Sequence, residues 1–247
     1  YGAVGDDFFE WFYWTLAIAV MIVVPFTAQR SLLAERDQAT YDLLSITTLT
    51  PRQIVRGKLL SALVQALIFY SAIAPFIAFT SLLQGFDFVF VASKLILTLL
   101  LSLFVTMAAI ASSTTVKQRQ WQAFATIGGL AAIVWISSAL LAGLDSSLRH
   151  FDPTDLEQWG GLIFAVVMGA SYFVLFQNIA TAQLTFEADD RSSGIRFICS
   201  VQFFLVWIGL LALAWLGSGP GLDEDLIITA TILSALHLGV VGLFITT

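Results

Sequence analysis

Charged residues are scarce in this chain. They make up 11% of its 247 residues, whereas hydrophobic residues make up 58% and the mean hydropathy is +0.89. In a soluble domain, roughly a quarter of the residues would be charged. The composition therefore excludes an ordinary soluble globular protein and indicates a membrane protein.

Residues that commonly carry out catalysis or bind metals are also few. The single cysteine, Cys199, excludes a disulfide framework, and the only histidines are His150 and His237. The chain has no H-E-x-x-H pair and no G-x-S-x-G turn, and the segment "GKLL" lacks the glycine spacing and the Ser or Thr of a phosphate-binding loop. We therefore predict no catalytic, cofactor-binding or metal-binding residues and expect that the chain is not an enzyme.

Long apolar segments dominate the rest of the sequence. Each has about 18 residues or more, which is enough for a helix to cross the hydrocarbon layer. They cover residues 11–29, 59–83, 89–113, 123–144, 161–184, 197–217 and 226–245. The predicted fold class is all-α, a polytopic helical membrane protein with about seven transmembrane helices. None of these spans carries an acidic residue near its middle, which argues against an ion-coupled secondary transporter.

The basic residues indicate the orientation of these spans. If the N-terminus is external and the loops alternate, nine of the eleven Lys and Arg residues fall inside, and only Lys94 and Arg149 fall outside. Basic residues concentrate on the cytosolic side of membrane proteins. This orientation places residues 30–58 in the cytosol and Lys94 near an outer boundary, where we expect its ammonium to snorkel toward the headgroups.

Several residues inside the spans suggest how the helices are shaped and joined. Buried amides in membrane helices usually form hydrogen bonds between helices, and an internal proline tends to kink its helix. The amides are those of Gln65, Gln177, Asn178 and Gln202, and the prolines are Pro25 and Pro75. We expect both groups to have structural roles.

The chain begins at Tyr1 rather than at a methionine, and no targeting segment precedes the first span. Because the N-terminus is predicted to be external, we expect at least one earlier span. We interpret residues 1–247 as a single transmembrane domain from a longer protein.

The cytosolic segment 30–58 is unusual because it carries eight charges between two apolar spans. Its residues 31–48 place leucines on one side of a helical wheel and most polar residues on the other, which predicts an amphipathic helix along the membrane surface. The β-branched run before Pro51 ends that helix. Thr50 and Gln53 then have the spacing of a capping box, and Pro51 suits a first helical position, so a new helix is predicted to begin there.

The ordered residues of this segment resemble the type-2 ABC transporter permeases, the membrane subunits of ABC exporters. The residues that carry the resemblance are Glu35, Arg36, Thr40, Leu43, Leu44, Thr50, Pro51, Gly57, Lys58, Leu59 and Leu60. The family usually has six spans with this motif after the second. Here one predicted span precedes the motif and six follow it.

The resemblance implies a function and a set of partners. Residues 31–48 would be the coupling helix of a permease domain, and the motif residues from Glu35 to Lys58 would transmit the closure of an ABC ATPase subunit to the spans. ATP and Mg would be bound by that partner, and this chain would hold no cofactor. A second permease copy or a paralogue would complete a dimer in the inner (plasma) membrane of a bacterium, with no role for nucleic acid.

Two other interpretations remain open from the sequence. Segment 30–58 is also compatible with a solvated, positively charged loop, as any polytopic protein has. In that case the chain would be a membrane scaffold or assembly protein without a transport pathway. An ion-coupled secondary transporter is the third alternative.

Overall fold

The computed structural model describes residues 4–37, 50–80, 88–115, 119–150, 154–185 and 193–217, together with a few residues between 228 and 239. Within these residues every secondary-structure element is helical. The chain divides into two compact units, Tyr1–His150 and Phe151–Thr247. A single permease domain over residues 1–247 stays a prediction.

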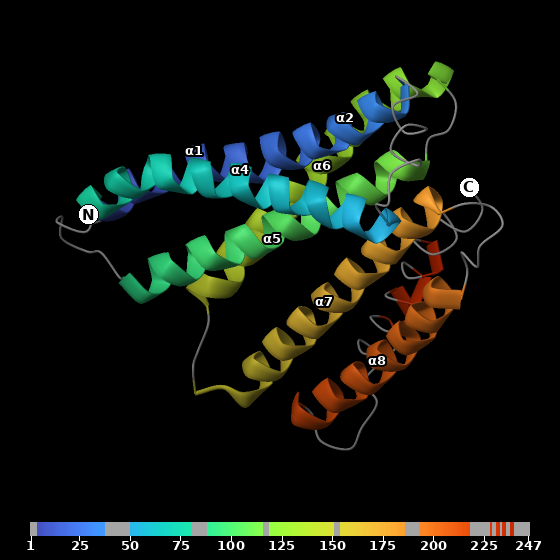
Figure 1. The fold of residues 1–247 in the computed structure, drawn as a ribbon. Helices are drawn as coiled ribbons and strands as arrows, with labels where there is room; N and C mark the ends of the chain where they lie inside the picture. Colours follow the sequence, from blue (N-terminus) through green and yellow to red (C-terminus); the bar gives the residue numbers. More distant parts are fainter. Residues whose placement is uncertain are drawn as a thin grey trace. The chain divides into compact units, whose positions relative to one another are not determined.

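The elements follow one another as long helices (Figure 1). They are α1 (Val4–Ile18), the π-helical turn η1 (Ala19–Val23), α2 (Val24–Asp37), α4 (Pro51–Thr80), α5 (Phe88–Thr115), α6 (Arg119–Arg149), α7 (Leu156–Leu184) and α8 (Ser193–Gly217). Because α1, η1 and α2 follow one another without interruption, the first predicted span is one helix from Val4 to Asp37.

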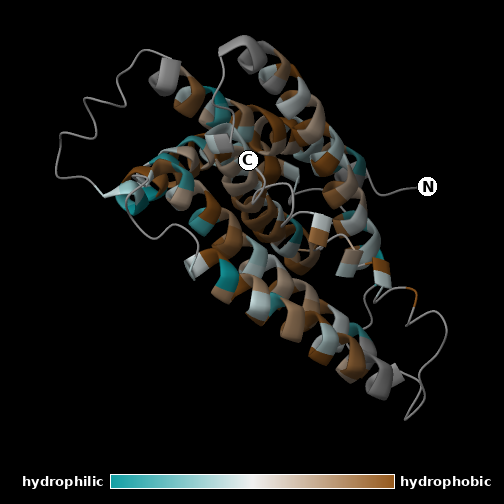
Figure 2. Ribbon diagram, turned by 90° about the vertical axis from the view of Figure 1, so that its right-hand side faces the viewer, coloured by the Kyte–Doolittle hydropathy of each residue, from teal (hydrophilic) through white to brown (hydrophobic). Residues whose placement is uncertain are grey.

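Six of the described helices are long and apolar enough to cross a membrane, and apolar residues predominate along them (Figure 2). The spans are Asp7–Ala34, Pro51–Thr80, Phe88–Thr114, Thr126–Arg149, Gln158–Leu184 and Ser193–Ala212. These six match the first six predicted spans, and the protein is a multi-pass membrane protein by length and composition. The predicted seventh span, 226–245, lies largely outside the described residues.

The first span forms the centre of the unit 1–150. In its most apolar window 44% of the residues are buried, compared with 28% for α5, the next most buried span of this unit. It packs most extensively against α5, and its neighbours also include α4 and α6. The core joins Phe9, Tyr13, Ala17 and Met21 of this helix to residues of α5 and α6 such as Val105 and Ile133. Close packing of this kind holds membrane helices together, because lipid is as apolar as the side chains.

The π-helical turn in this first span has an identifiable cause. The amide of Val24 donates to the carbonyl of Ala19, one residue further back than in an α-helix. Pro25 has no amide hydrogen to donate to the carbonyl of Met21. In an α-helix the carbonyls of Val20 and Met21 would accept from the amides of residues 24 and 25. Here neither carbonyl receives that hydrogen bond.

Hydroxyl groups from two other helices bond these carbonyls. Ser102 Oγ of α5 donates to the carbonyl of Val20 at 2.8 Å, and Ser137 Oγ of α6 donates to the carbonyl of Met21 at 2.8 Å. Both serines are buried. Neighbouring hydroxyls are one of the ways in which a membrane helix compensates for a proline, so the irregular turn also fixes the rotation of α5 and α6 around the first span.

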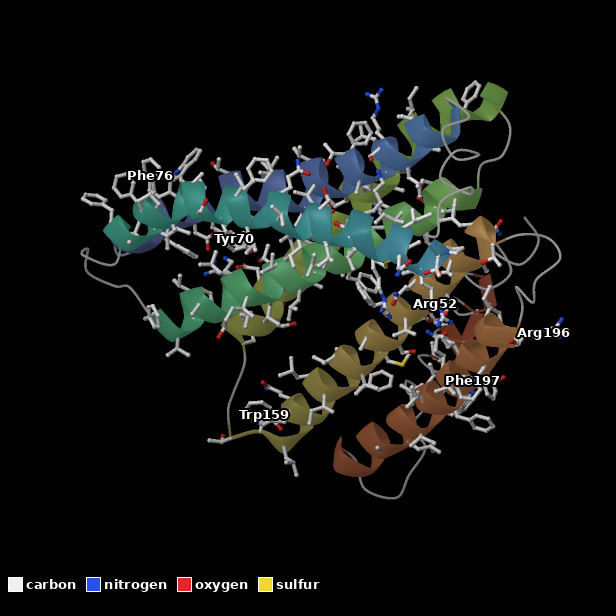
Figure 3. All side chains as sticks on the ribbon, viewed as in Figure 1. Arg52, Tyr70, Phe76, Trp159, Arg196 and Phe197 are labelled. Carbon is white, nitrogen blue, oxygen red and sulfur yellow. The ribbon has the colours of Figure 1, made fainter. Side chains whose placement is uncertain are left out.

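The unit 151–247 is built on the antiparallel pair α7 and α8 (Figure 1). Gly209 lies so close to the ring of Phe164 that a Cβ at position 209 would overlap it. Trp159 near the start of α7 and Arg196 near the start of α8 mark opposite ends of the pair (Figure 3). Gln202 is fully buried on α8, and neither atom of its amide has a hydrogen-bond partner in the described part of the chain.

Candidate functional site

The predicted coupling residues are distributed over the end of α2, the connection to α4 and the start of α4. The backbones of Glu35 and Arg36 belong to the last turn of α2. Thr50 immediately precedes α4, and Pro51 is its first residue. Gly57 and Lys58 follow in the next turns of the same helix. The remaining three predicted residues, Thr40, Leu43 and Leu44, lie outside the described residues.

A capping box begins α4, as the sequence predicted. The backbone amide of Thr50 donates to Gln53 Oε1 at 2.9 Å, and the backbone amide of Gln53 donates to Thr50 Oγ1 at 3.4 Å. Each side chain thus satisfies the main-chain donor of the other, the reciprocal arrangement that defines this cap. Pro51 occupies the first helical position, where a missing amide hydrogen costs little. The start of α4 is therefore fixed by local contacts.

The predicted amphipathic helix 31–48 is not confirmed as a separate element. Its first part, residues 31–37, continues α2 from the first span, and residues 38–49 lie outside the described part of the chain. Leu32 and Leu33, which were expected to face the membrane surface, are 2% and 6% exposed and belong to the protein core. Sequence periodicity did not show this difference, because an apolar face packs equally well against lipid or protein.

Two side-chain hydrogen bonds join α2 to α4 near this connection. Lys58 Nζ donates to Ser31 Oγ at 2.6 Å, and Thr27 Oγ1 donates to Gln65 Oε1 at 3.0 Å. The second bond confirms that Gln65 forms a hydrogen bond between helices. Asn178, for which the same was expected, donates instead to the carbonyl of Val174 in its own helix.

An open groove with a mixed polar and apolar lining lies between α2 and α4 at the level of these bonds. Its volume is about 600 Å³. It is lined by Thr27, Ala28, Ser31, Gln53, Ile54, Gly57, Lys58, Ser61, Ala62 and Gln65. Lysine supplies the only charge among these ten residues, and a Cβ at Gly57 would meet no atom within 4 Å. Two predicted coupling residues, Gly57 and Lys58, therefore line a groove that sequence reasoning did not anticipate.

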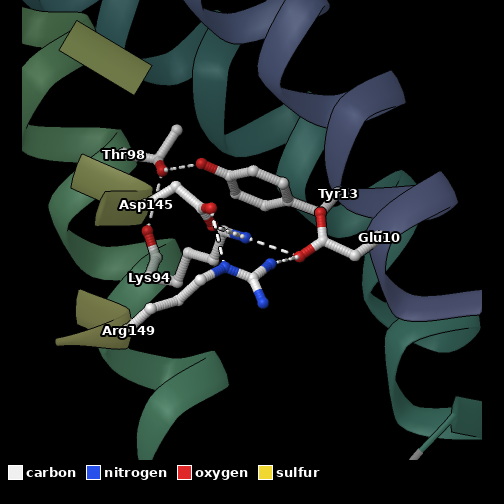
Figure 4. A network of polar contacts seen from close by, with 6 residues as sticks. All are labelled: Glu10, Tyr13, Lys94, Thr98, Asp145 and Arg149. Atoms are coloured by element: carbon white, nitrogen blue, oxygen red, sulfur yellow. Dashed lines mark hydrogen bonds and ion pairs between the residues drawn. The ribbon is translucent and has the colours of Figure 1, made fainter. Parts of the chain in front are cut away.

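A cluster of four charged side chains joins α1, α5 and α6 (Figure 4). Lys94 Nζ lies 2.8 Å from Glu10 Oε1 and 2.8 Å from Asp145 Oδ1. Arg149 contacts the same two acids, with Nη2 3.0 Å from Glu10 Oε1 and Nε 2.7 Å from Asp145 Oδ2. Two cations and two anions balance formally, so the cluster links three helices without a net charge.

The expectation that Lys94 snorkels toward the headgroups is wrong. Its side chain is 1% exposed, whereas Arg149 is 52% exposed. The ammonium also lies 4.3 Å from the centroid of the Tyr13 ring, within the range of a cation–π contact. A buried ammonium requires partners of opposite charge, and here Glu10 and Asp145 supply them.

A weak signal of this cluster was present in the sequence. Glu10 and Asp145 each lie one residue beyond a predicted span, and Lys94 and Arg149 are the two basic residues assigned to the outer side. The four charges therefore fall near the ends of predicted spans on the side assigned to the exterior. The sequence did not indicate that the helices bring them into contact.

The cluster continues inward through neutral hydrogen bonds. Tyr13 Oη and Thr98 Oγ1 lie 2.9 Å apart, and Thr98 Oγ1 donates to the carbonyl of Lys94 at 2.7 Å. Both contacts are buried. Lys94, Thr98 and Tyr13 therefore form one polar layer that fixes α1 against α5.

Neither the groove nor the charge cluster has the donor set of a metal centre. Among the described residues, no group of three or more His, Cys, Asp or Glu side chains is placed to hold a metal ion. The charge cluster pairs its acids with cations, which suits the joining of helices better than proton transfer to a substrate. The groove offers one ammonium with hydroxyl and amide groups, which suits the binding of an anion.

Comparison of the chain with protein-family models, curated proteins and solved structures yields no match.

Proposed function

We propose that this chain is the membrane-spanning permease subunit of an ATP-driven ABC exporter, and that it couples closure of a separate ABC ATPase to alternating access. The proposal is supported by a multi-pass helical architecture and by the ordered motif residues between the first two described spans. ATP and Mg would be held by the partner ATPase. A second permease copy or a paralogue would supply the other half of the transport path.

Contacts at the start of α4 support this proposal independently of the resemblance. The motif residues Thr50 and Lys58 lie at the capped start and in the first turns of α4, and Lys58 Nζ donates to Ser31 Oγ of α2 at 2.6 Å. A force applied to the connection between α2 and α4 would therefore act on both helices together. Coupling ATPase movement to the spans requires such a mechanical link.

The link extends from the cytosolic connection into the bundle. The helix that ends at Asp37 continues back to Val4. Along it, Ser102 and Ser137 bond the π-helical turn, and Lys94 and Arg149 bond Glu10 near the far end. Displacement of α2 would thus reach α5 and α6 through hydrogen bonds and ion pairs as well as through packing.

The test uses the full-length protein expressed with its ABC ATPase. A Leu43→Asp, Leu44→Asp double variant should lose the associated ATPase, because helix-in-groove contacts depend on a few apolar anchors and burial of unpaired carboxylates is costly. A Leu43→Met, Leu44→Met variant is the matched control and should retain the ATPase. Membrane insertion is checked by carbonate extraction and should be equal for all three proteins.

Two outcomes would contradict the proposal. If the aspartate variant retains the ATPase and its normal stimulation of ATP hydrolysis, the segment is a solvated loop. If the wild-type protein, solubilised in mild detergent, carries no ABC ATPase, the scaffold or assembly interpretation is favoured instead.

A further inference from the structure

The groove between α2 and α4 has a position and a chemistry that point to a ligand. It opens where Lys58 meets Ser31, and Gln53, Ser61 and Thr27 also line it. These side chains offer one ammonium together with hydroxyl and amide groups, and none of the lining residues is acidic. A phosphate ester matches this set, because hydroxyl, amide and ammonium donors all bond phosphate oxygens.

Further basic residues stand beside the lining residues in the sequences of α2 and α4. Arg30 on α2 and Arg52 and Arg56 on α4 are exposed. Arg52 lies near the start of α4, and Phe76 lies toward its opposite end (Figure 3). The positive-inside pattern assigns the Arg52 end to the cytosolic leaflet, where anionic lipids attract basic residues.

The outer surface of α4 changes from basic to apolar within two turns of Lys58. Leu60, Val64, Leu67 and Ile68 are 48–60% exposed and follow one another at helical spacing. In a membrane this stripe faces hydrocarbon, while Lys58 stands at the level where the apolar segment begins. A ligand bound here would meet cationic groups at one end and an apolar surface beside them.

We propose that the groove between α2 and α4 binds the phosphate headgroup of an anionic phospholipid from the cytosolic leaflet. Lys58 and Ser31 contact the phosphodiester, Gln53 and Ser61 bond the remaining headgroup atoms, and the acyl chains lie along the stripe from Leu60 to Ile68. Basic pockets between membrane helices on the cytosolic side are suited to this role. The site does not depend on the proposed transport function.

Gly57 allows the groove to be filled without changing any charge. A Cβ at this position would meet no atom within 4 Å, so a larger side chain can start from position 57 into open space. Gly57→Leu therefore removes the space for the headgroup, whereas Lys58→Met removes the charge. The two variants test shape and electrostatics separately.

The experiment is a titration of the delipidated full chain in detergent with phosphatidylglycerol or phosphatidylcholine, followed by native mass spectrometry. The wild-type protein should bind the first phosphatidylglycerol more tightly than phosphatidylcholine. Lys58→Met should reduce this preference about fivefold, as expected for one basic residue near an anionic lipid. Gly57→Leu should weaken binding of the first phosphatidylglycerol, and Arg56→Gln, which changes an exposed cation outside the groove lining, should have the smallest effect.

Three results would overturn the proposal. The first is equal affinity of the wild-type protein for the two lipids, and the second is unchanged phosphatidylglycerol binding in Gly57→Leu. The third is displacement of the lipid by inorganic phosphate at a matched concentration, which would identify a site for a soluble phosphate compound. Lys58→Met removes the hydrogen bond to Ser31 as well as the charge. Gly57→Leu retains Lys58 and this bond, so its effect on lipid binding does not arise from loss of that contact.

Discussion

Lys94 on α5 and Asp145 on α6 lie 51 positions apart in the sequence, and Lys94 Nζ is 2.8 Å from Asp145 Oδ1. Glu10 on α1 contacts the same ammonium at 2.8 Å. Because the lysine side chain is 1% exposed while the acids are 29% and 31% exposed, the desolvation cost falls mainly on the lysine. The ammonium is thus the central member of the cluster.

Lys94→Met should lower the free energy of unfolding by about 2–3 kcal/mol. This is close to, or slightly less than, the usual cost of removing one partner of a buried ion pair. The cost is moderated because Glu10 and Asp145 remain paired with Arg149 and are partly exposed to solvent. Arg149→Met, the control at a site that is 52% exposed, should cost about 1 kcal/mol or less. Unfolding in detergent micelles with increasing dodecyl sulfate measures both values. Equal losses in the two variants would contradict the central role of Lys94.

The hydroxyl of Ser137 should contribute more to stability when Pro25 is present. Ser137→Ala removes the donor to the Met21 carbonyl and should cost about 1 kcal/mol, as hydrogen bonds between membrane helices do. Pro25→Ala supplies an amide hydrogen for the same carbonyl. In the Pro25→Ala background the serine substitution should therefore cost less, which gives a coupling energy of about 0.5–1 kcal/mol in a double-mutant cycle.

The control for this cycle is Ser138→Ala. Ser138 is exposed, and its hydroxyl bonds the carbonyl of Trp135 in its own helix. Its substitution should have the same small effect with and without Pro25. Strictly additive losses for Pro25 and Ser137 would show that the serine does not compensate for the proline.

The orientation can be tested with two exposed serines in a Cys199→Ser background. Ser147 near the end of α6 and Ser193 at the start of α8 are both exposed, and the distribution of basic residues assigns them to opposite sides. In intact cells a membrane-impermeant maleimide should label Ser147→Cys but not Ser193→Cys. After permeabilisation both should react. Labelling of position 193 from outside would reverse the topology and place the connection between α2 and α4 on the outer side.

The sequence alone determined the features that depend on local chemistry. Apolar length was enough to locate six of the spans, because a helix in hydrocarbon must satisfy its own backbone and cover the membrane thickness. Thr50 and Gln53 predicted the start of α4, because a capping box needs only residues three positions apart. The distribution of Lys and Arg also predicts an orientation, because the basic residues of each loop can be counted without knowing how the helices pack.

Tertiary structure decided which side chains meet. The helices are apolar on nearly every face, so periodicity does not show which face packs against protein and which against lipid. Lys94 was therefore expected at the headgroups, although it is buried between Glu10 and Asp145. The pairing of Ser137 with the carbonyl that Pro25 leaves open and the groove beside Lys58 depend in the same way on how neighbouring helices are rotated. That rotation is set by contacts among residues far apart in the chain, which no local pattern records.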